Sequence, residues 1–287
     1  MMFLTRENSE PGRLLWYGDT NRVADPQYPE SSPRRLIPHT WVLTERILRR
    51  WGRDQATVIE ALILPVALLV TLNIVLGDGI SQLTGHSALY GSVPLAAMVG
   101  AMSGATVGGL GLMKERTDGL LSRLWVLPVH RASGLLSRLA ADAVRILVTT
   151  AVIMCAGLVL GFRFRQGILG PVAWLFVPTV FGVAFSALVT TLALYSAKTI
   201  VVEATAIIYA LLMFFSTGFV PLDQYPRWIQ PVVQHQPMSY AIEAMRGLSL
   251  DGPVLAPMLE TLLWSGGIGA VCLIPMAFGY RRASMRG

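Results

Sequence analysis

The sequence predicts an all-α integral membrane protein with six transmembrane helices. Of its 287 residues, 53% are hydrophobic and 14% are charged, and the mean hydropathy is +0.55. Ordinary soluble domains are less apolar and more charged. A helix needs roughly 20 mostly apolar residues to cross a bilayer, and six windows meet this requirement. They are residues 56–77, 93–113, 139–161, 168–197, 199–222 and 254–279.

Charge places both ends of the chain on the cytoplasmic side. Six spans put the termini on one side, and 19 of the 23 Lys and Arg residues then fall on that side. Cytoplasmic loops of membrane proteins carry this excess of basic residues. The net charge of +6 therefore reflects topology in the membrane, and it does not indicate a nucleic-acid binding protein.

Two regions, residues 1–40 and 41–54, precede the predicted transmembrane domain. Residues 1–40 carry no continuous apolar core, so we expect a mobile cytoplasmic tail and no cleaved signal peptide. Residues 41–54 predict an amphipathic helix in the inner interface, and 55–285 form the transmembrane domain. A solvated helix on a cytoplasmic domain is the alternative for 41–54. The residues that define this helix are Arg46, Arg49, Arg50 and Arg53 on one face and Trp51 on the other.

Small residues mark one face of the second span. Gly100, Gly104 and Gly108 recur at a spacing of four, which lets helix backbones approach closely. The spacing predicts helix packing, either within the bundle or against another subunit.

Four ionisable residues fall within or near the apolar spans, namely Glu60, Arg145, Glu203 and Glu260. Charge inside a membrane is costly and usually faces protein or water. Interfacial pairing or snorkelling is one interpretation, and a functional role is the other. Similar predicted depth suggests that Arg145 pairs with Glu203 or Glu60.

An outer segment separates the last two spans and contains a predicted helix from Met238 to Leu250. Ala241, Met245 and Leu248 share one face of it, so it can lie against the outer ends of the bundle. It is too short to cross the bilayer.

Motifs for chemistry are absent from the sequence. There is no GxxxxGK[ST] phosphate loop, no metal-ligand spacing among the histidines and no GxSxG or HExxH motif. The two cysteines lie in apolar windows and predict no disulfide. We expect no enzyme active site and no metal site, and any ATP must be hydrolysed by another chain.

The segment from Lys114 to Gly134 is basic at both ends and apolar in the middle. Thr117 can cap a short helix with Asp118 in its first turn, and Pro128 ends it. At about 1.5 Å per residue this helix is too short to span, so it lies on the cytoplasmic surface. Its spacing fits lipid headgroups and a partner's groove equally. Its apolar face consists of Leu120, Leu121, Leu124 and Trp125.

These residues resemble ABC type-2 exporter permeases of the daunorubicin-resistance kind, over about residues 41–284. The cytoplasmic loop of that family has an acidic-basic pair, a Gly-Leu step and a Pro-x-x-Arg. The matching residues here are Glu115, Arg116, Gly119, Leu120, Pro128 and Arg131. The outer segment is similar to that of the family at Pro221, Pro226, Trp228, Pro237 and Arg246.

The resemblance implies a six-helix half-transporter that pairs with a second permease subunit and two copies of a separate ATPase. ATP and Mg would be bound by that ATPase. Residues 117–127 would be the coupling helix, assisted by the helix at 41–53, and the outer segment would form short re-entrant helices. RLWVLPVHRASGL, LGFRFRQG, HQPMSYAI and GYRRAS are similar to a mycobacterial branch that exports phthiocerol dimycocerosate lipids.

Two other functions are alternatives to an ATP-driven exporter. A proton-coupled secondary transporter could use Glu60, Glu203 and Glu260, although six spans without an inverted repeat argue against it. A membrane-embedded lipid-modifying enzyme would need a catalytic set that the sequence lacks.

Overall fold

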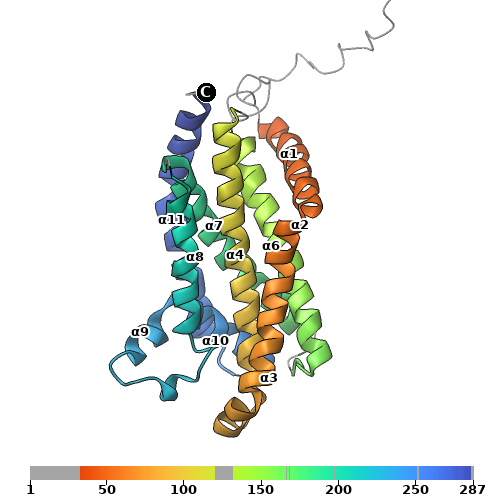
Figure 1. Cartoon of the computed structure of the whole chain (residues 1–287), viewed down its shortest axis with the longest axis vertical. Coiled ribbons are helices and arrows are strands. Elements are labelled where there is room, and N and C mark those ends of the chain that lie inside the picture. The colour runs from red at the N-terminus through yellow and green to blue at the C-terminus, as the bar shows by residue number, and fades with distance from the viewer. Residues whose placement is uncertain are drawn as a thin grey trace, which may run out of the picture.

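The computed structural model describes residues 33–119, 132–165, 167, 169–196, 198–250 and 252–285. All regular elements in these ranges are helices, which confirms the all-α class (Figure 1). They are α1 Pro33–Arg53, α2 Gln55–Val58, π-helical η2 Ile59–Ile63, α3 Leu64–Thr84, α4 Leu89–Thr117, α6 Ser133–Leu160, α7 Leu169–Tyr195, α8 Thr199–Phe214, 3-10 helical η3 Leu222–Gln224, α9 Gln230–His235, α10 Pro237–Leu250 and α11 Leu255–Met285.

The long helices run alternately up and down the bundle (Figure 1). Helix α1 and the last turns of α11 lie at the same end, drawn at the top. The C-terminal end of α4 and the start of α6 lie there too, whereas α9 and α10 lie across the lower part. We call these the upper and lower ends of the bundle.

Five helices in the described ranges are long and apolar enough to cross a membrane: α3 with the end of η2, α4, α6, α7 and α11. The fifth predicted span, 199–222, corresponds to α8, which is apolar but has 16 residues. At about 1.5 Å per residue α8 rises about 24 Å, less than the roughly 30 Å of a bilayer core. Five of the six predicted spans therefore correspond to full-length helices in the described ranges, and the one at 199–222 stays a prediction.

Helix α8 can end early because side chains of the outer segment donate hydrogen bonds to its last carbonyl groups. The Tyr225 hydroxyl donates to the carbonyl oxygen of Phe214 at 2.7 Å. Burial raises the pKa of Tyr225 above its ordinary value. The Gln236 amide donates to the carbonyls of Leu212 and Phe215. Non-helical backbone is tolerated at membrane depth where protein groups satisfy it in this way.

The predicted helix of the outer segment is confirmed as α10, one residue longer at its start. Ala241, Met245 and Leu248 are all buried, as their shared face predicts. Helix α10 packs against α4, α7 and α11, so it belongs to the bundle's core.

The other predicted residues of the outer segment lie around α10. Arg246 pairs with Glu243 at 2.8 Å and donates to the carbonyl of Thr217 at 2.9 Å, which joins α10 to the chain after α8. Pro221 precedes η3, and Pro237 begins α10. The carbonyl of Pro226 accepts from the amide of Ile229, whereas Trp228 is 78% exposed.

Helix α1 begins at Pro33, eight residues before the predicted start and within the predicted tail. Its basic residues Arg46, Arg49, Arg50 and Arg53 are exposed, and Trp51 is half-buried on the inner side. The helix packs along α6, so its inner face covers protein. Exposed apolar residues near its start, Ile37, Trp41 and Val42, remain available for lipid.

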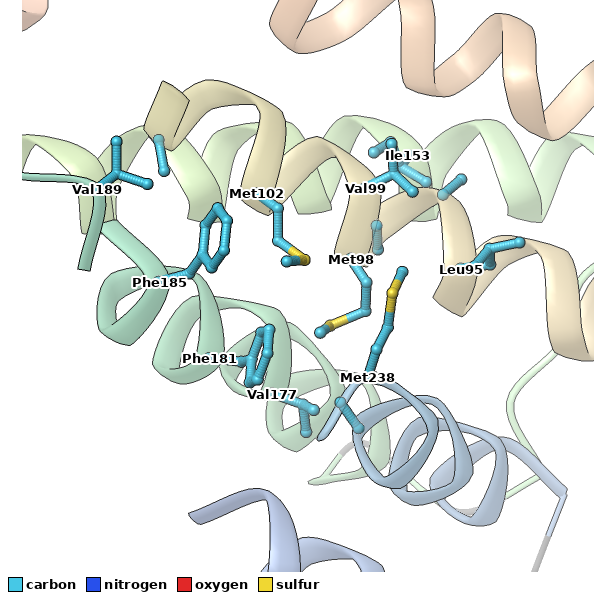
Figure 2. Close-up of a cluster of buried hydrophobic side chains, with 14 of the residues drawn as sticks. Leu95, Met98, Val99, Met102, Ile153, Val177, Phe181, Phe185, Val189 and Met238 are labelled. Atoms are coloured by element: carbon cyan, nitrogen blue, oxygen red, sulfur yellow. The ribbon is translucent and has the colours of Figure 1, made fainter. Parts of the chain in front are cut away.

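Helix α4 is the centre of the bundle and contacts α3, α6, α7, α8 and α10. Figure 2 shows Leu95, Met98, Val99 and Met102 of α4 facing residues of α6, α7 and α10. A helix that meets neighbours on all sides must be apolar or small all round, which explains its many Ala, Gly and Ser residues.

The glycine face of α4 packs within the bundle, against α6, which answers the question that the sequence left open. A Cβ atom at Gly100 would lie 2.9 Å from Thr149 Cγ2, and one at Gly104 would lie 2.8 Å from Arg145 Nε. At Gly108 it would lie 3.5 Å from Asp142 Oδ1. The stripe brings α4 close to α6 and leaves room for a buried arginine.

A fourth glycine, Gly109, contacts the opposite neighbours. We expect Gly109→Ala to destabilise the protein by about 1–3 kcal/mol, because the added Cβ would lie 2.5 Å from Val189 Cγ1 and 3.0 Å from Val202 Cγ1, both on stiff side chains. Gly111→Ala is the matched control, since nothing lies within 4 Å of its added Cβ. Thermal unfolding in one detergent measures both variants. Equal stability would contradict the close approach of α4 to α7 and α8.

Candidate functional site at the upper end of the bundle

Three charged residues at the upper end join three helices. Glu115, in the last turn of α4, is 8% exposed. One carboxylate oxygen lies 3.1 Å from Arg50 Nη1 on α1, and the other accepts from Arg138 Nη2 on α6. We call Arg50, Glu115 and Arg138 the Glu115 cluster. A carboxylate with an arginine on each oxygen is stable at low exposure because both oxygens are paired and hydrogen-bonded.

The next residue, Arg116, joins α4 to a fourth helix. Its Nη1 donates to the carbonyls of Leu194 and Ser196, both at 2.9 Å, at the C-terminal end of α7. The last carbonyls of a helix have no partner within it and carry partial negative charge, so a guanidinium is favourable there. Glu115 and Arg116 together connect the end of α4 to α1, α6 and α7.

The structure corrects the predicted start of the coupling helix. Thr117 was expected to cap it, but Thr117 is the last residue of α4, and its hydroxyl donates to the carbonyl of Met113 at 2.9 Å. Asp118 is the C-cap, and Gly119 follows with φ of +69°, a left-handed conformation that favours glycine at a helix end. The ion pairs of Glu115 and the hydrogen bonds of Arg116 hold α4 together beyond its predicted apolar window, which ends at Met113.

The remaining residues of the predicted coupling helix fall outside the described residues. These are Leu120, Leu121, Leu124, Trp125, Pro128 and Arg131. Their predicted role therefore stays a prediction. What the structure describes is the anchor immediately before them, at Glu115 to Gly119, and the start of α6 after them.

Below the Glu115 cluster lies a second buried charge pair. Arg145 Nη2 is 2.9 Å from Asp142 Oδ1 on the same helix, without the angle of a hydrogen bond. Asp142 also accepts from the Ser186 hydroxyl of α7. Arg145 thus pairs with Asp142, and the predicted partner Glu203 is exposed on α8. Asp142 lies three residues before Arg145, so the two side chains share one face of α6 and can pair. Similar depth in the membrane did not bring Glu203 to Arg145, because Glu203 lies on another helix.

The other acidic residues of the membrane region lie apart from this pair. Glu60 lies in η2, the π-helical turn before α3. Pro65, near the start of α3, has no N–H to donate to the carbonyl of Ala61, as a continuous α-helix would require. Glu260, in the second turn of α11, is half-buried beside a groove of about 500 Å³ between α7 and α11. The groove is mostly apolar and is lined by Leu188, Leu263, Trp264, Gly267, Ile268, Val271 and Cys272 as well as Glu260.

A pocket of about 340 Å³ lies between the Glu115 cluster and the Arg145 pair. Residues of α1, α4 and α6 form most of it, with Thr190 of α7. Its charged lining residues are Arg50, Asp54, Lys114, Glu115, Arg138, Asp142 and Arg145, and its apolar ones include Ile47, Trp51, Val107 and Leu110. In the described part of the chain, no three His, Cys, Asp or Glu side chains gather as a metal site would require.

Sequence reasoning did not identify Arg138, Ser186 or Gly109 as site or packing residues. Arg138 was counted only among the basic residues that predict the cytoplasmic side. Its position in the sequence did not predict that it would pair with Glu115. Ser186 lies 44 residues from Asp142, so only tertiary structure brings them together.

Comparison with known proteins identifies the family of this chain. The family model described as ABC-2 type transporter matches residues 38–250. The chain belongs to the ABC-2 type transporter family. It is therefore a multi-pass membrane permease of a family of ABC transporters, and the resemblance found in the sequence is confirmed.

Relatives of this ABC-2 permease carry related names. It is 54% identical to the "probable doxorubicin resistance ABC transporter permease protein DrrC" of Mycobacterium tuberculosis, over 89% of this chain and 92% of that protein. It is 27% identical to the "daunorubicin resistance ABC transporter permease protein DrrB1" of Streptomyces coeruleorubidus, over 74% of each chain. It is also 27% identical to the "putative transport permease ycf38" of Cyanophora paradoxa, over 85% of this chain and 86% of that one.

Neutralising Glu115 tests the first cluster of this ABC-2 permease. We expect Glu115→Gln to destabilise the protein by about 2 kcal/mol, because Arg138, with its side chain 14% exposed, loses its charged partner. Glu45→Gln is the matched control, since the Glu45–Arg49 pair is exposed and worth about 0.5 kcal/mol or less. Thermal unfolding of the purified variants gives both values. Similar losses for the two variants would show that Glu115 is not a structural anchor.

Proposed function

We propose that this chain is a permease subunit of an ATP-driven exporter in the cytoplasmic membrane, with both termini cytoplasmic. A separate ABC ATPase, DrrA-like and present in two copies, binds ATP and Mg. A second, DrrB-like permease completes the transmembrane path. Family membership supports the transport class, and the basic residues of α1, α4 and α6 support a cytoplasmic upper end.

One observation carries the coupling part of the proposal. The predicted coupling helix, residues 117–127, follows Glu115 and Arg116, which hold α4 against α1, α6 and α7. A displacement of that segment by an ATPase would reach four helices through ion pairs and hydrogen bonds. A segment attached to one helix alone would move the bundle far less effectively.

The proposed cargo is a large apolar lipid of the phthiocerol dimycocerosate type, or an amphipathic drug. The names of the relatives support a drug, and the mycobacterial sequence motifs support the lipid. The apolar groove between α7 and α11 would suit either, because its open side presents Leu263 and Trp264. The bundle surface beside it is also apolar, as a path open to lipid requires.

Transport driven by ATP tests the function directly. We expect vesicles holding this chain, the second permease and the ATPase to export lipid or drug on addition of ATP and Mg, and to stop when the ATPase is left out. Labelled phthiocerol dimycocerosate and doxorubicin are the probes. Movement of either by this chain alone under a proton gradient would overturn the proposal in favour of a proton-coupled transporter.

Charge on the predicted apolar face tests the coupling segment. We expect Leu124→Asp or Trp125→Asp to abolish co-purification of the ATPase while membrane insertion is kept, because a buried unpaired carboxylate is costly in an apolar groove. Ser122→Asp, on the other side of the predicted helix, is the control. If the Leu124→Asp complex still assembles and exports, residues 117–127 do not form the ATPase contact.

A further inference from the structure

We propose that the pocket between α1, α4 and α6 binds the phosphoryl headgroup of an anionic phospholipid of the inner leaflet. The pocket of about 340 Å³ is far larger than one buried water requires. The transport proposal does not use it, and the lipid proposed here is a resident ligand distinct from the cargo.

Two buried donors without hydrogen-bond partners point to a ligand that supplies acceptors. Trp51 and Arg145 are both lining residues of this pocket, and each has a buried nitrogen, Nε1 and Nη2, without a hydrogen-bond partner among the described residues. Arg145 is 6% exposed, and its ion pair with Asp142 leaves Nη2 poorly aligned. Buried donors are nearly always satisfied, so an oxygen-rich group in the pocket would account for both.

The charge around the pocket favours an anion. A second hollow, lined by the exposed arginines of α1, adjoins the pocket and shares Arg50 and Asp54 with it. Seven basic residues line the two together, against the three carboxylates of Asp54, Glu115 and Asp142. One of the seven, Arg49, also pairs with the carboxylate of Glu45. The basic residues are Arg46, Arg49, Arg50, Arg53, Lys114, Arg138 and Arg145.

The apolar part of the lining favours a lipid over a free ion. Ile47 and Trp51 of α1 and Val107 and Leu110 of α4 line the pocket beside the charged groups. A phosphate from solution would leave this surface uncovered, whereas the glycerol and upper acyl chain of a phospholipid would cover it. Basic pockets between membrane helices on the cytoplasmic side are suited to such headgroups.

Native mass spectrometry of the full chain tests the site without transport or ATPase. The chain is transferred from nanodiscs of equal phosphatidylglycerol and phosphatidylcholine with the same acyl chains, and the retained lipids are counted. We expect phosphatidylglycerol to be retained in preference. Equal retention of the two lipids would overturn the proposal. Because the readout is binding alone, failure of the proposed export function would leave this result unaffected.

Two pairs of variants locate the site. Gly111→Leu places a side chain in the pocket at a position with no atom within 4 Å of the added Cβ, so we expect it to remove the preference. Gly269→Leu on α11, with equally open surroundings, should keep it. Lys114→Gln removes an exposed charge at the pocket and should weaken retention about fivefold, the effect of one basic residue near a membrane surface. Lys198→Gln, outside the pocket, should not.

Thermal unfolding separates loss of the site from loss of the fold. If Gly111→Leu unfolds, Lys114→Gln decides the question, because its side chain is exposed. A preference that survives both substitutions would place the lipid elsewhere and refute the site. Release of the bound lipid by millimolar inorganic phosphate would show that the site takes free anions, and would refute a lipid ligand.

Discussion

The buried carboxylate of Glu115 is the interaction on which the upper end of this bundle depends. It accepts from arginines of α1 and α6 while its own backbone belongs to the central helix α4. A carboxylate at this low exposure needs both partners, since an unpaired charge there would cost several kcal/mol. The three helices are therefore held in one arrangement, and Arg116 adds α7 to it through the carbonyls of Leu194 and Ser196.

The same logic of satisfied polar groups organises the rest of the molecule. At the lower end, Tyr225 and Gln236 satisfy the last carbonyls of α8, which lets the chain turn back into the bundle as α10. In the middle, Gly104 and Gly108 leave space for Arg145, whose charge is paired with Asp142. Polar groups thus fix the ends and the register of helices, while apolar and small residues around α4 fill the space between them.

Periodicity and composition predicted the helices well, because a bilayer imposes a length and an apolar composition that single sequences display. The buried face of α10 and the exposed arginines of α1 followed from helical spacing alone. Predictions failed where a polar contact overrode the pattern. Glu115 and Arg116 carried α4 past its apolar window, which moved Thr117 from a helix start to a helix end. The pairing of Arg145 with Asp142, and of Glu115 with Arg138, depends on helix rotation and packing, which no local pattern records.

Glu115 joins α4 to α6 through Arg138, and a double-mutant cycle measures the strength of this ion pair. The unfolding free energies of Glu115→Gln, Arg138→Gln and the double variant would be compared with that of the unmodified chain in the same detergent. We expect a coupling free energy of at least about 1 kcal/mol, because Glu115→Gln leaves Arg138 without its charged partner and Arg138→Gln leaves Glu115 with Arg50 alone. Additive losses, with a coupling free energy near zero, would contradict it.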